Sequence, residues 1–152
     1  MCNESLYLLD VLIHRFLDGP EVYELERECF SVPWSIKSIS EELQNANARF
    51  LLAEINGETA GYVGSYFVSG EVYITNVAVK NKHRRKGVAV GLLSELIDLA
   101  KEAESEFVSL EVRCSNTPAI SLYGKLGFGK IGIRKSFYEN PREDALIMTK
   151  YL

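Results

Sequence analysis

The sequence contains few of the residues from which disulfide frameworks and metal sites are built. Its 152 residues include three cysteines and two histidines. The cysteines, Cys2, Cys29 and Cys114, are odd in number and widely scattered, which argues against a disulfide framework. His14 and His83 do not belong to a CxxC or HxxxH pattern, and the sequence therefore predicts no metal site.

The sequence also lacks a long apolar run and an excess of positive charge. No run approaches the roughly 18 residues that suggest a membrane span. The stretch 6–16 is interrupted by Asp10 and His14 and has no basic start or small-residue cleavage site, so we expect a strand there and not an export signal. A net charge of -4 argues against general affinity for nucleic acid. These absences predict a cytoplasmic protein that binds neither membranes nor nucleic acid directly.

What is present is typical of one globular domain. Hydrophobic residues make up 47% of the chain and charged residues 25%, as in ordinary soluble folds. A chain of this length can bury one core but not two independent ones. We therefore expect a single domain over residues 1–152 with a single site.

Periodicity and turn residues predict the order of the elements. A strand over Val11–Phe16 precedes a helix that starts near Gly19 and a second helix that Ser35 caps and that ends near Asn45. Asn56-Gly57 predicts a type I′ hairpin turn, because both positions of that turn need positive φ. Further strands are predicted over 49–55, 58–68, 72–79, 107–113, 128–133 and 145–151, and helices from 87 and over 117–127. The order β-α-α-β-β-β-α-β-α-β-β predicts a mixed α/β layer fold.

The segment from Val77 to Val90 joins a predicted buried strand to an amphipathic helix. A helix start presents unpaired amides, and small residues at Gly87 and Ala89 let a pyrophosphate approach them. Five basic residues between Lys80 and Lys86 add counter-charge. A solvated basic loop or a nucleic-acid patch would explain the charge, but neither needs small residues there. A Rossmann loop needs GxGxxG after the first strand, which the sequence does not have.

A second segment, residues 110–128, carries a carboxylate and a phenol. The two-residue period of a strand places Glu111 on the face opposite the apolar side chains. Tyr123 follows on the next predicted helix. Taken alone, Glu111 is better explained as a surface residue or a partner of Arg113 than as a catalytic group, and Tyr123 as an aromatic at the edge of the core.

Both segments resemble a known family. The spacing R-x-x-G-x-A from Arg84 to Ala89 resembles the acetyl-CoA signature (Q/R)-x-x-G-x-(G/A) of the GNAT acetyltransferases. Residues 110–128 resemble the LEVRxSNxxAIxLYxxxGF block of the RimI subfamily, the bacterial ribosomal-protein N-terminal alanine acetyltransferases. Similarity at 33–35, 76–93 and 134–148 extends over most of the chain except the first strand and the hairpin. The resemblance implies the GNAT fold, a mostly antiparallel mixed sheet of about seven strands flanked by about four helices.

The resemblance also implies a role for each matching residue. Glu111 would be the general base and Tyr123 the general acid. Asn116 would hydrogen-bond the cosubstrate acetyl-CoA, and the amide of Val77 is our candidate for the oxyanion donor. The residues implied to bind acetyl-CoA are Val77, Ala78 and Val79 at the pantetheine and Arg84, Arg85, Lys86, Gly87, Val88, Ala89 and Val90 around the phosphates.

Substrate contact is implied for Tyr138, in the predicted loop between the last two strands. A packing role would explain this tyrosine equally well. The subfamily has a Tyr-Tyr pair here, and Phe137 replaces its first member, which removes one possible hydrogen bond to the peptide. Peptide preference is therefore less firmly implied than the reaction.

The chemistry of the acceptor favours a protein N-terminus. With reference pKa values of about 7.8 for an α-amine and 10.4 for lysine, roughly 14% of the first and ~0.04% of the second is neutral at pH 7. One modest base therefore suffices for an N-terminus. Cys114 has no histidine near it in the sequence, so we expect direct transfer in a ternary complex and no acyl-enzyme.

The expected substrate is the N-terminal alanine of a small-subunit ribosomal protein, as the resemblance implies. Three alternatives remain at this point. In the first, the protein is an acetyltransferase of the same kind whose acceptor is another protein N-terminus, a lysine or a small-molecule amine. A non-catalytic acyl-CoA-binding protein would keep the phosphate loop, and a nucleic-acid-binding module would explain its charge only.

Overall fold

The computed structural model describes residues 11–14, 19–30 and 32–152, whose strands form one seven-stranded sheet of order β1-β2-β3-β4-β5-β7-β6. The strands are β1 Val11–His14, β2 Ala48–Ile55, β3 Glu58–Val68, β4 Glu71–Val79, β5 Phe107–Arg113, β6 Gly129–Tyr138 and β7 Glu143–Tyr151. The helices are α2 Gly19–Cys29, α3 Ile36–Leu43, α4 Val88–Glu102 and α5 Thr117–Lys125, with a 3-10 turn at Asn81–His83. The predicted order of elements and the mixed α/β fold are confirmed.

Turn and cap residues act where the sequence predicted them. Asn56 and Gly57 have φ of 51° and 77°, so both positions of the β2–β3 turn lie in the left-handed region that a type I′ turn needs. The Ser35 hydroxyl accepts a hydrogen bond from the Ser38 amide at 3.1 Å and caps α3. Gly127, with φ of 96°, follows the end of α5. Residues 15 and 16 of the predicted first strand lie outside the described residues.

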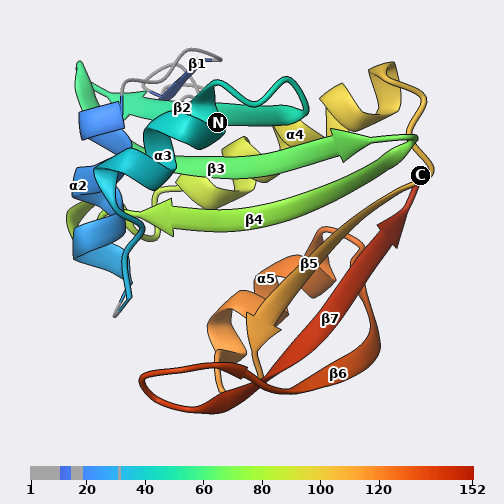
Figure 1. Ribbon diagram of the computed structural model, residues 1–152. Helices are drawn as coiled ribbons and strands as arrows, with labels where there is room; N and C mark the ends of the chain where they lie inside the picture. Colours follow the sequence, from blue (N-terminus) through green and yellow to red (C-terminus); the bar gives the residue numbers. More distant parts are fainter. Residues whose placement is uncertain (1–10, 15–18, 31) are drawn as a thin grey trace.

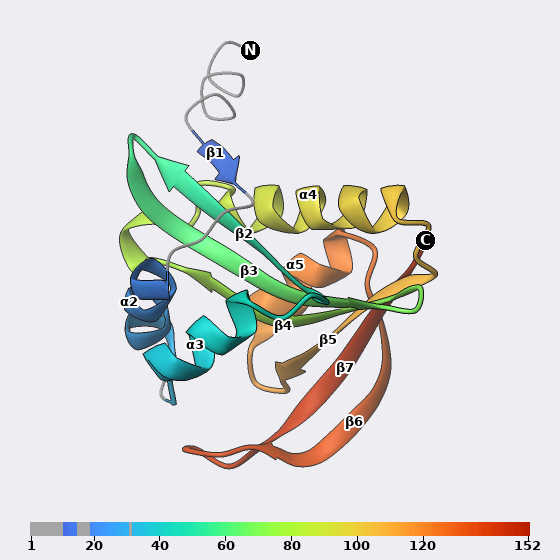
Figure 2. The same ribbon diagram turned by 45° about the horizontal axis from the view of Figure 1, so that its top comes forward.

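Helices cover both faces of the sheet (Figures 1 and 2). On one face α4 and α5 pack against a large cluster that includes Leu92, Leu96 and Leu110. On the other face α2 and α3 bury a smaller cluster that includes Leu25 and Ile39. Among the described residues, no helix is long and apolar enough to cross a membrane.

The sheet divides in its middle, between β4 and β5. These two strands are parallel and form three residue pairs, from Glu71 with Phe107 to Tyr73 with Ser109. All the other neighbouring strands pair antiparallel. Beyond Tyr73 the strands separate, as Figure 1 shows, and the later residues of β4 and β5 lie on two arms of the sheet. A register shift places one extra residue, Thr75, in β4 just beyond this point.

The last hairpin differs from the prediction in its bounds. We expected strands over 128–133 and 145–151, whereas β6 continues to Tyr138 and β7 begins at Glu143. Tyr138 is therefore the last residue of a strand, paired with Glu143, and does not lie in a loop. Register shifts between Arg134 and Tyr138 allow β6 to continue past the residues that looked like a loop in sequence.

Candidate functional site

The start of α4 has the geometry expected of an anion-binding loop. Gly87 is the N-cap, with φ of 78° and no side-chain hydrogen bond to the helix. A Cβ built at Gly87 would meet no atom within 4 Å, so the backbone there is open to a ligand. The first amides of a helix have no intrahelical acceptor and lie at the positive end of its dipole. The loop can therefore bind a phosphate through its backbone.

The basic residues before α4 do not all contribute in the way the sequence predicted. Glu58 of β3 forms ion pairs with Lys82 at 2.5 Å and with Lys80 at 3.8 Å. The Nε of Arg84 donates to the carbonyl oxygen of Val79 at 3.1 Å, which closes the loop onto the end of β4. Arg85 and Lys86 are exposed. Glu58 offsets one of the two positive charges of Lys80 and Lys82, so Arg84, Arg85 and Lys86 keep most of the positive charge of this loop.

The other predicted cofactor residues lie along β4 and the first turn of α4. Val77 and Val79 are half-buried and pack toward the α4 face, whereas Ala78 is buried toward α2. Val88 is 2% exposed and belongs to the core cluster under α4, so its side chain does not reach a ligand. Ala89 is half-buried and Val90 is exposed. The structure thus brings the predicted strand and loop together at one edge of the β4 arm.

Glu111 lies on the β5 arm, and its partner is not the one that the sequence suggested. The Nε of Arg134, on β6, contacts Oε1 of Glu111 at 3.1 Å. Arg113, the partner considered from sequence, pairs with Glu143 instead. Glu111 and Arg113 point to the same side of β5 because they are two residues apart. Charged side chains from neighbouring strands nevertheless lie closer to each of them. Arg134 therefore orients the candidate base.

Tyr138 lies within electrostatic range of the Glu111 carboxylate, and Tyr123 lies within range of Tyr138. Tyr123 is 8% exposed and packs its ring edge against Phe128, and burial raises its pKa to about 12. The pKa of Tyr138 is also raised to about 12, first by burial and then by the negative charge of Glu111. Tyr123 acts on Tyr138 in the same direction, so the three side chains share one electrostatic neighbourhood. Both phenols remain protonated at neutral pH and can donate a proton.

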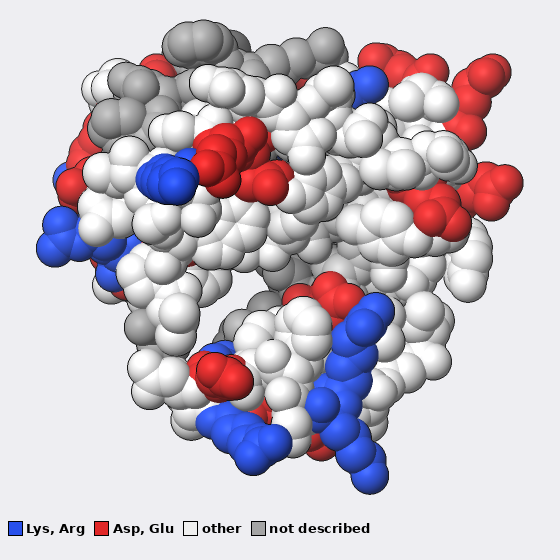
Figure 3. Space-filling view, in the orientation of Figure 1, with Lys and Arg blue, Asp and Glu red and all other residues white. Residues whose placement is uncertain are grey.

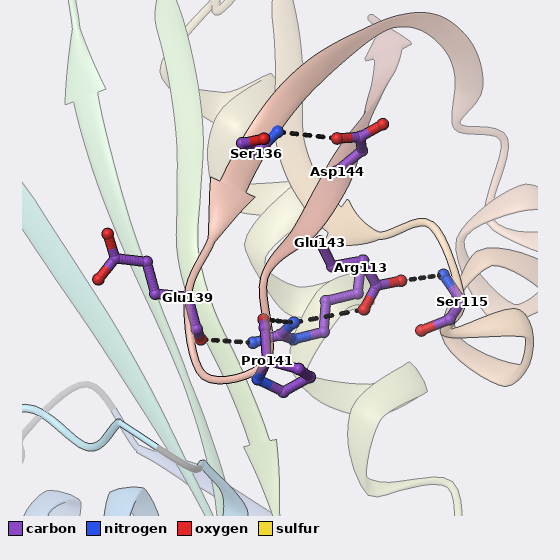
Figure 4. Close-up of polar contacts among 7 residues, drawn as sticks. All are labelled: Arg113, Ser115, Ser136, Glu139, Pro141, Glu143 and Asp144. Carbon is purple, nitrogen blue, oxygen red and sulfur yellow. Dashed lines mark hydrogen bonds and ion pairs between the residues drawn. The ribbon is translucent and has the colours of Figure 1, made fainter.

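Arg113 organises the connection between β6 and β7 (Figure 4). Its guanidinium donates to the carbonyl oxygens of Pro141 and Glu139 at 2.9 and 3.1 Å and forms an ion pair with Glu143 at 3.3 Å. The same group lies 4.5 Å from the ring centroid of Tyr138. A planar fork of five donors can make all these contacts at once. Arg113 thus positions the loop and the predicted substrate tyrosine together.

Asn116 occupies the N-cap of α5. Its Oδ1 accepts a hydrogen bond from the Ala119 amide at 3.3 Å. Just before it, the Ser115 amide donates to Glu143 at 2.7 Å, which connects the start of α5 to the Arg113 cluster. The capping role was not part of the sequence prediction, and contact with the cosubstrate stays a prediction for this residue.

The two arms face each other across a depression. Figure 3 shows that the surface is hollowed between the part that carries β4 and the part that carries β5 to β7. The β4 edge and the loop of residues 80–87 before α4 lie on one side, and Glu111, Tyr123 and Tyr138 belong to the other. Within the described ranges, no group of three or more His, Cys, Asp or Glu side chains is arranged to hold a metal ion. The arrangement can hold an elongated, phosphate-bearing ligand next to a carboxylate and two phenols.

Sequence reasoning missed Arg134 and Glu143 as parts of this site. Both residues lie on the last hairpin, and each reaches the site only through the register of β5, β7 and β6. Glu143 had one usable signal, because it lies within the segment 134–148 that resembles the RimI subfamily. Arg134 stands at the edge of the same resemblance but carries no pattern of its own.

Known proteins share this fold and much of this sequence. Residues 19–128 match the model of the acetyltransferase (GNAT) family. A Bacillus subtilis protein, provisionally named a ribosomal protein bS18-alanine N-acetyltransferase, is 42% identical over 135 residues, which cover 88% of this chain and 89% of that relative.

Solved structures agree with this match. The ribosomal-protein-S18-alanine N-acetyltransferase from Escherichia coli superposes with a TM-score of 0.87 at 32% identity, covering 93% of each chain. A GNAT family acetyltransferase from Elizabethkingia anophelis, solved with acetyl-CoA bound, gives a TM-score of 0.77 at 28% identity over 94% of this chain and 99% of that one. The chain, with its divided sheet and open helix start, belongs to the acetyltransferase (GNAT) family.

Proposed function

We propose that this protein transfers the acetyl group of acetyl-CoA to the N-terminal alanine amine of a ribosomal protein, by direct transfer in a ternary complex. The acceptor is suggested by the relatives from Bacillus subtilis and Escherichia coli, which are named for this substrate. Acetyl-CoA is the donor in the proposal because the Elizabethkingia anophelis relative binds it. The proposed site of action is the cytoplasm, where ribosomal proteins are made.

One observation carries the proposal: the separation of β4 from β5 after three residue pairs. It leaves the backbone of Val77 to Val79 next to an open helix start on one arm and an acid–base pair on the other. A thioester with a diphosphate tail has the shape and charge that match the first arm. An amine that must lose a proton matches the second arm.

The residues have the following roles in the proposed reaction. Glu111 accepts a proton from the α-ammonium group, and the neutral amine forms a bond to the thioester carbonyl carbon. The Val77 amide donates to the oxyanion that results. As the carbon–sulfur bond breaks, Tyr123 donates its proton to the thiolate, and the extra proton on the new amide nitrogen returns to the tyrosinate. Glu111 releases its proton to water, and the products are the N-acetylated peptide and free CoA. The raised pKa of Tyr123 keeps that proton available.

Tyr138 and the Arg113 cluster would contact the peptide. Tyr138 lies within the electrostatic reach of Glu111, and Arg113 holds its ring and the following loop. The exposed Glu139 side chain adds negative charge beside them. This side of the depression suits a basic peptide that enters with its N-terminus first.

The test compares three peptides by mass spectrometry with acetyl-CoA as donor. The first is an alanine-starting ribosomal peptide, the second is the same peptide blocked at its N-terminus with an internal lysine, and the third starts with a bulky residue. We expect acetylation of the first peptide at its N-terminus, none of the second and less of the third. Acetylation of the internal lysine would assign a different acceptor, and CoA binding without any turnover would indicate a sensor.

A further inference from the structure

Glu26 is a charged residue buried in the smaller core. It lies on α2 among Val22, Leu25 and Cys29, the residues of the helix that face the sheet, and is 1% exposed. A carboxylate removed from water is costly unless hydrogen bonds replace its hydration. A charge in this position therefore needs a reason beyond packing.

Three donors from three different segments surround this carboxylate. Its Oε1 accepts hydrogen bonds from the Tyr62 hydroxyl of β3 and, at 2.8 Å, from Nδ2 of Asn76 on β4. Its Oε2 accepts from the Trp34 amide, between α2 and α3, at 3.3 Å. Burial raises the pKa of Glu26, while the bonds from Tyr62 and Trp34 lower it. An ionised carboxylate only accepts hydrogen bonds, so it can satisfy all three of these donors.

The same face of α2 holds β4 on both sides of the proposed pantetheine segment. Asn76, which Glu26 binds, immediately precedes Val77 and follows the extra residue Thr75. At the other end, the Cys29 thiol donates to the Val79 carbonyl at 3.4 Å. Glu28, also on α2, accepts from the Asn81 amide at 2.9 Å. Residues 77 to 79 are thus fixed from behind at each end.

We infer that Glu26 is a positioning residue for acetyl transfer: through Asn76 it sets the direction of the Val77 amide that receives the oxyanion. This inference rests on the proposed function. An irregularity at Thr75 lets the following peptide planes rotate relative to the sheet. The hydrogen bond between Glu26 and Asn76 lies next to that irregularity. By holding Asn76, it selects one orientation of the peptide plane that follows. Oxyanion donors lose their effect when the donor is displaced by a fraction of an ångström.

The test measures kcat and the two KM values for Glu26→Leu, Asn76→Ala and the double variant. We expect kcat to fall about 10- to 100-fold in each single variant, because a misdirected oxyanion donor acts in the transition state. The KM for acetyl-CoA should change less than about threefold, since the phosphates bind at Gly87. The double variant should lose no more than the worse single variant, because both changes break one contact.

Two further variants separate positioning from folding. Leu25→Ala removes apolar packing from the adjacent buried position on the same helix and serves as the control for a loosened α2. All variants are assayed at a temperature where circular dichroism shows them folded. Glu26→Gln keeps an oxygen for Tyr62 and Asn76 but turns an NH2 toward the Trp34 amide. We expect it to retain kcat within about threefold while lowering thermal stability.

The outcomes assign success or failure clearly. If Glu26→Leu and Asn76→Ala lower kcat no more than Leu25→Ala does, or if Glu26→Gln loses as much as Glu26→Leu, the positioning role is wrong while the proposed function stands. If the wild-type protein acetylates no amine at all, the proposed function fails first, and the inference about Glu26 fails with it.

Discussion

The two arms of the divided sheet are held in place by different means. Behind the β4 arm, a fully buried carboxylate and a half-buried thiol contact the strand, and helices α2 and α3 cover that face. On the β5 arm, the pairs Arg113–Glu143 and Arg134–Glu111 have side chains that are between 20% and 57% exposed. Water and salt compete with the second kind of contact far more than with the first.

This difference matches what each arm would bind. A cosubstrate with a constant shape is served by a rigid, preformed edge, which buried contacts provide. A peptide varies in sequence, and exposed ion pairs can adjust to it at small cost. The comparison predicts that changes on the β4 arm alter donor binding or the chemical step, whereas changes at the β6–β7 loop and at Arg113, which holds it, alter peptide binding.

The largest effect should come from the proposed acid–base pair, Glu111 on β5 and Tyr123 on α5. Glu111→Gln or Tyr123→Phe removes one proton-transfer group and should lower kcat about 10²- to 10⁴-fold. Glu106→Gln, an exposed carboxylate just before β5, is the matched control and should have little effect. Steady-state rates with a saturating donor check this. Near-normal activity in both catalytic variants would mean that the chemistry lies elsewhere.

A substitution in the phosphate-binding loop should separate donor binding from peptide binding. Gly87→Glu forces a side chain into φ of 78° and places a negative charge where the diphosphate is proposed to bind. We expect the Kd for CoA, measured by calorimetry, to rise at least about 10-fold. Gly70→Glu is a close control, because Gly70 has φ of 81°, equally open surroundings and a remote position in the β3–β4 turn. Equal losses of CoA affinity in both variants would indicate that backbone strain alone causes the effect.

A milder change on the β5 arm should weaken peptide binding and leave CoA binding unchanged. Arg113→Lys keeps the charge but cannot make the forked contacts to the loop carbonyls or the same stacking on Tyr138. The peptide KM should rise about three- to tenfold while the Kd for CoA stays constant. Arg49→Lys is the control, since Arg49 also stacks on an aromatic ring, Phe67, at 4.2 Å but away from the site. A change in CoA affinity in Arg113→Lys would contradict the separation of the arms.

The smallest effect concerns the helix layer that covers the β4 arm. Ser35→Ala removes the cap of α3 and should lower the free energy of unfolding by about 1 kcal/mol. Ser35→Asn supplies another capping oxygen and should recover most of that loss. Urea unfolding measures both. A change in kcat at a temperature where the variants are folded would show that this layer affects the site more directly than we propose.

Local signals in the sequence were enough for the order of elements and for the loop that opens α4. Asn56-Gly57, Ser35 and Gly87 each act through their own backbone or side chain, so their effect depends little on the rest of the fold. The contacts between distant strands could not be predicted in the same way. Arg134 meets Glu111 through the pairing of β6 with β7 and of β7 with β5, and nothing near Arg134 in the sequence encodes that pairing.

Glu26 shows a different limit of prediction from the sequence. Its position follows Val22 and Leu25 on the apolar face of a helix, so its burial was readable from spacing. Charged residues are rarely fully buried, so helical spacing alone does not predict a carboxylate at this position. The donors that make the position tolerable, Tyr62 and Asn76, are supplied by two strands far along the chain.

The contact between Cys29 and Val79 makes the thiols of this protein unequal. Cys114 is exposed, whereas Cys29 is half-buried and burial raises its pKa, so a thiol reagent meets a reactive and a protected cysteine. Cys2 lies outside the described residues and can be replaced by serine. In that background, the rate at which a thiol reagent labels Cys29 reports how often α2 separates from the sheet. The measurement needs no substrate.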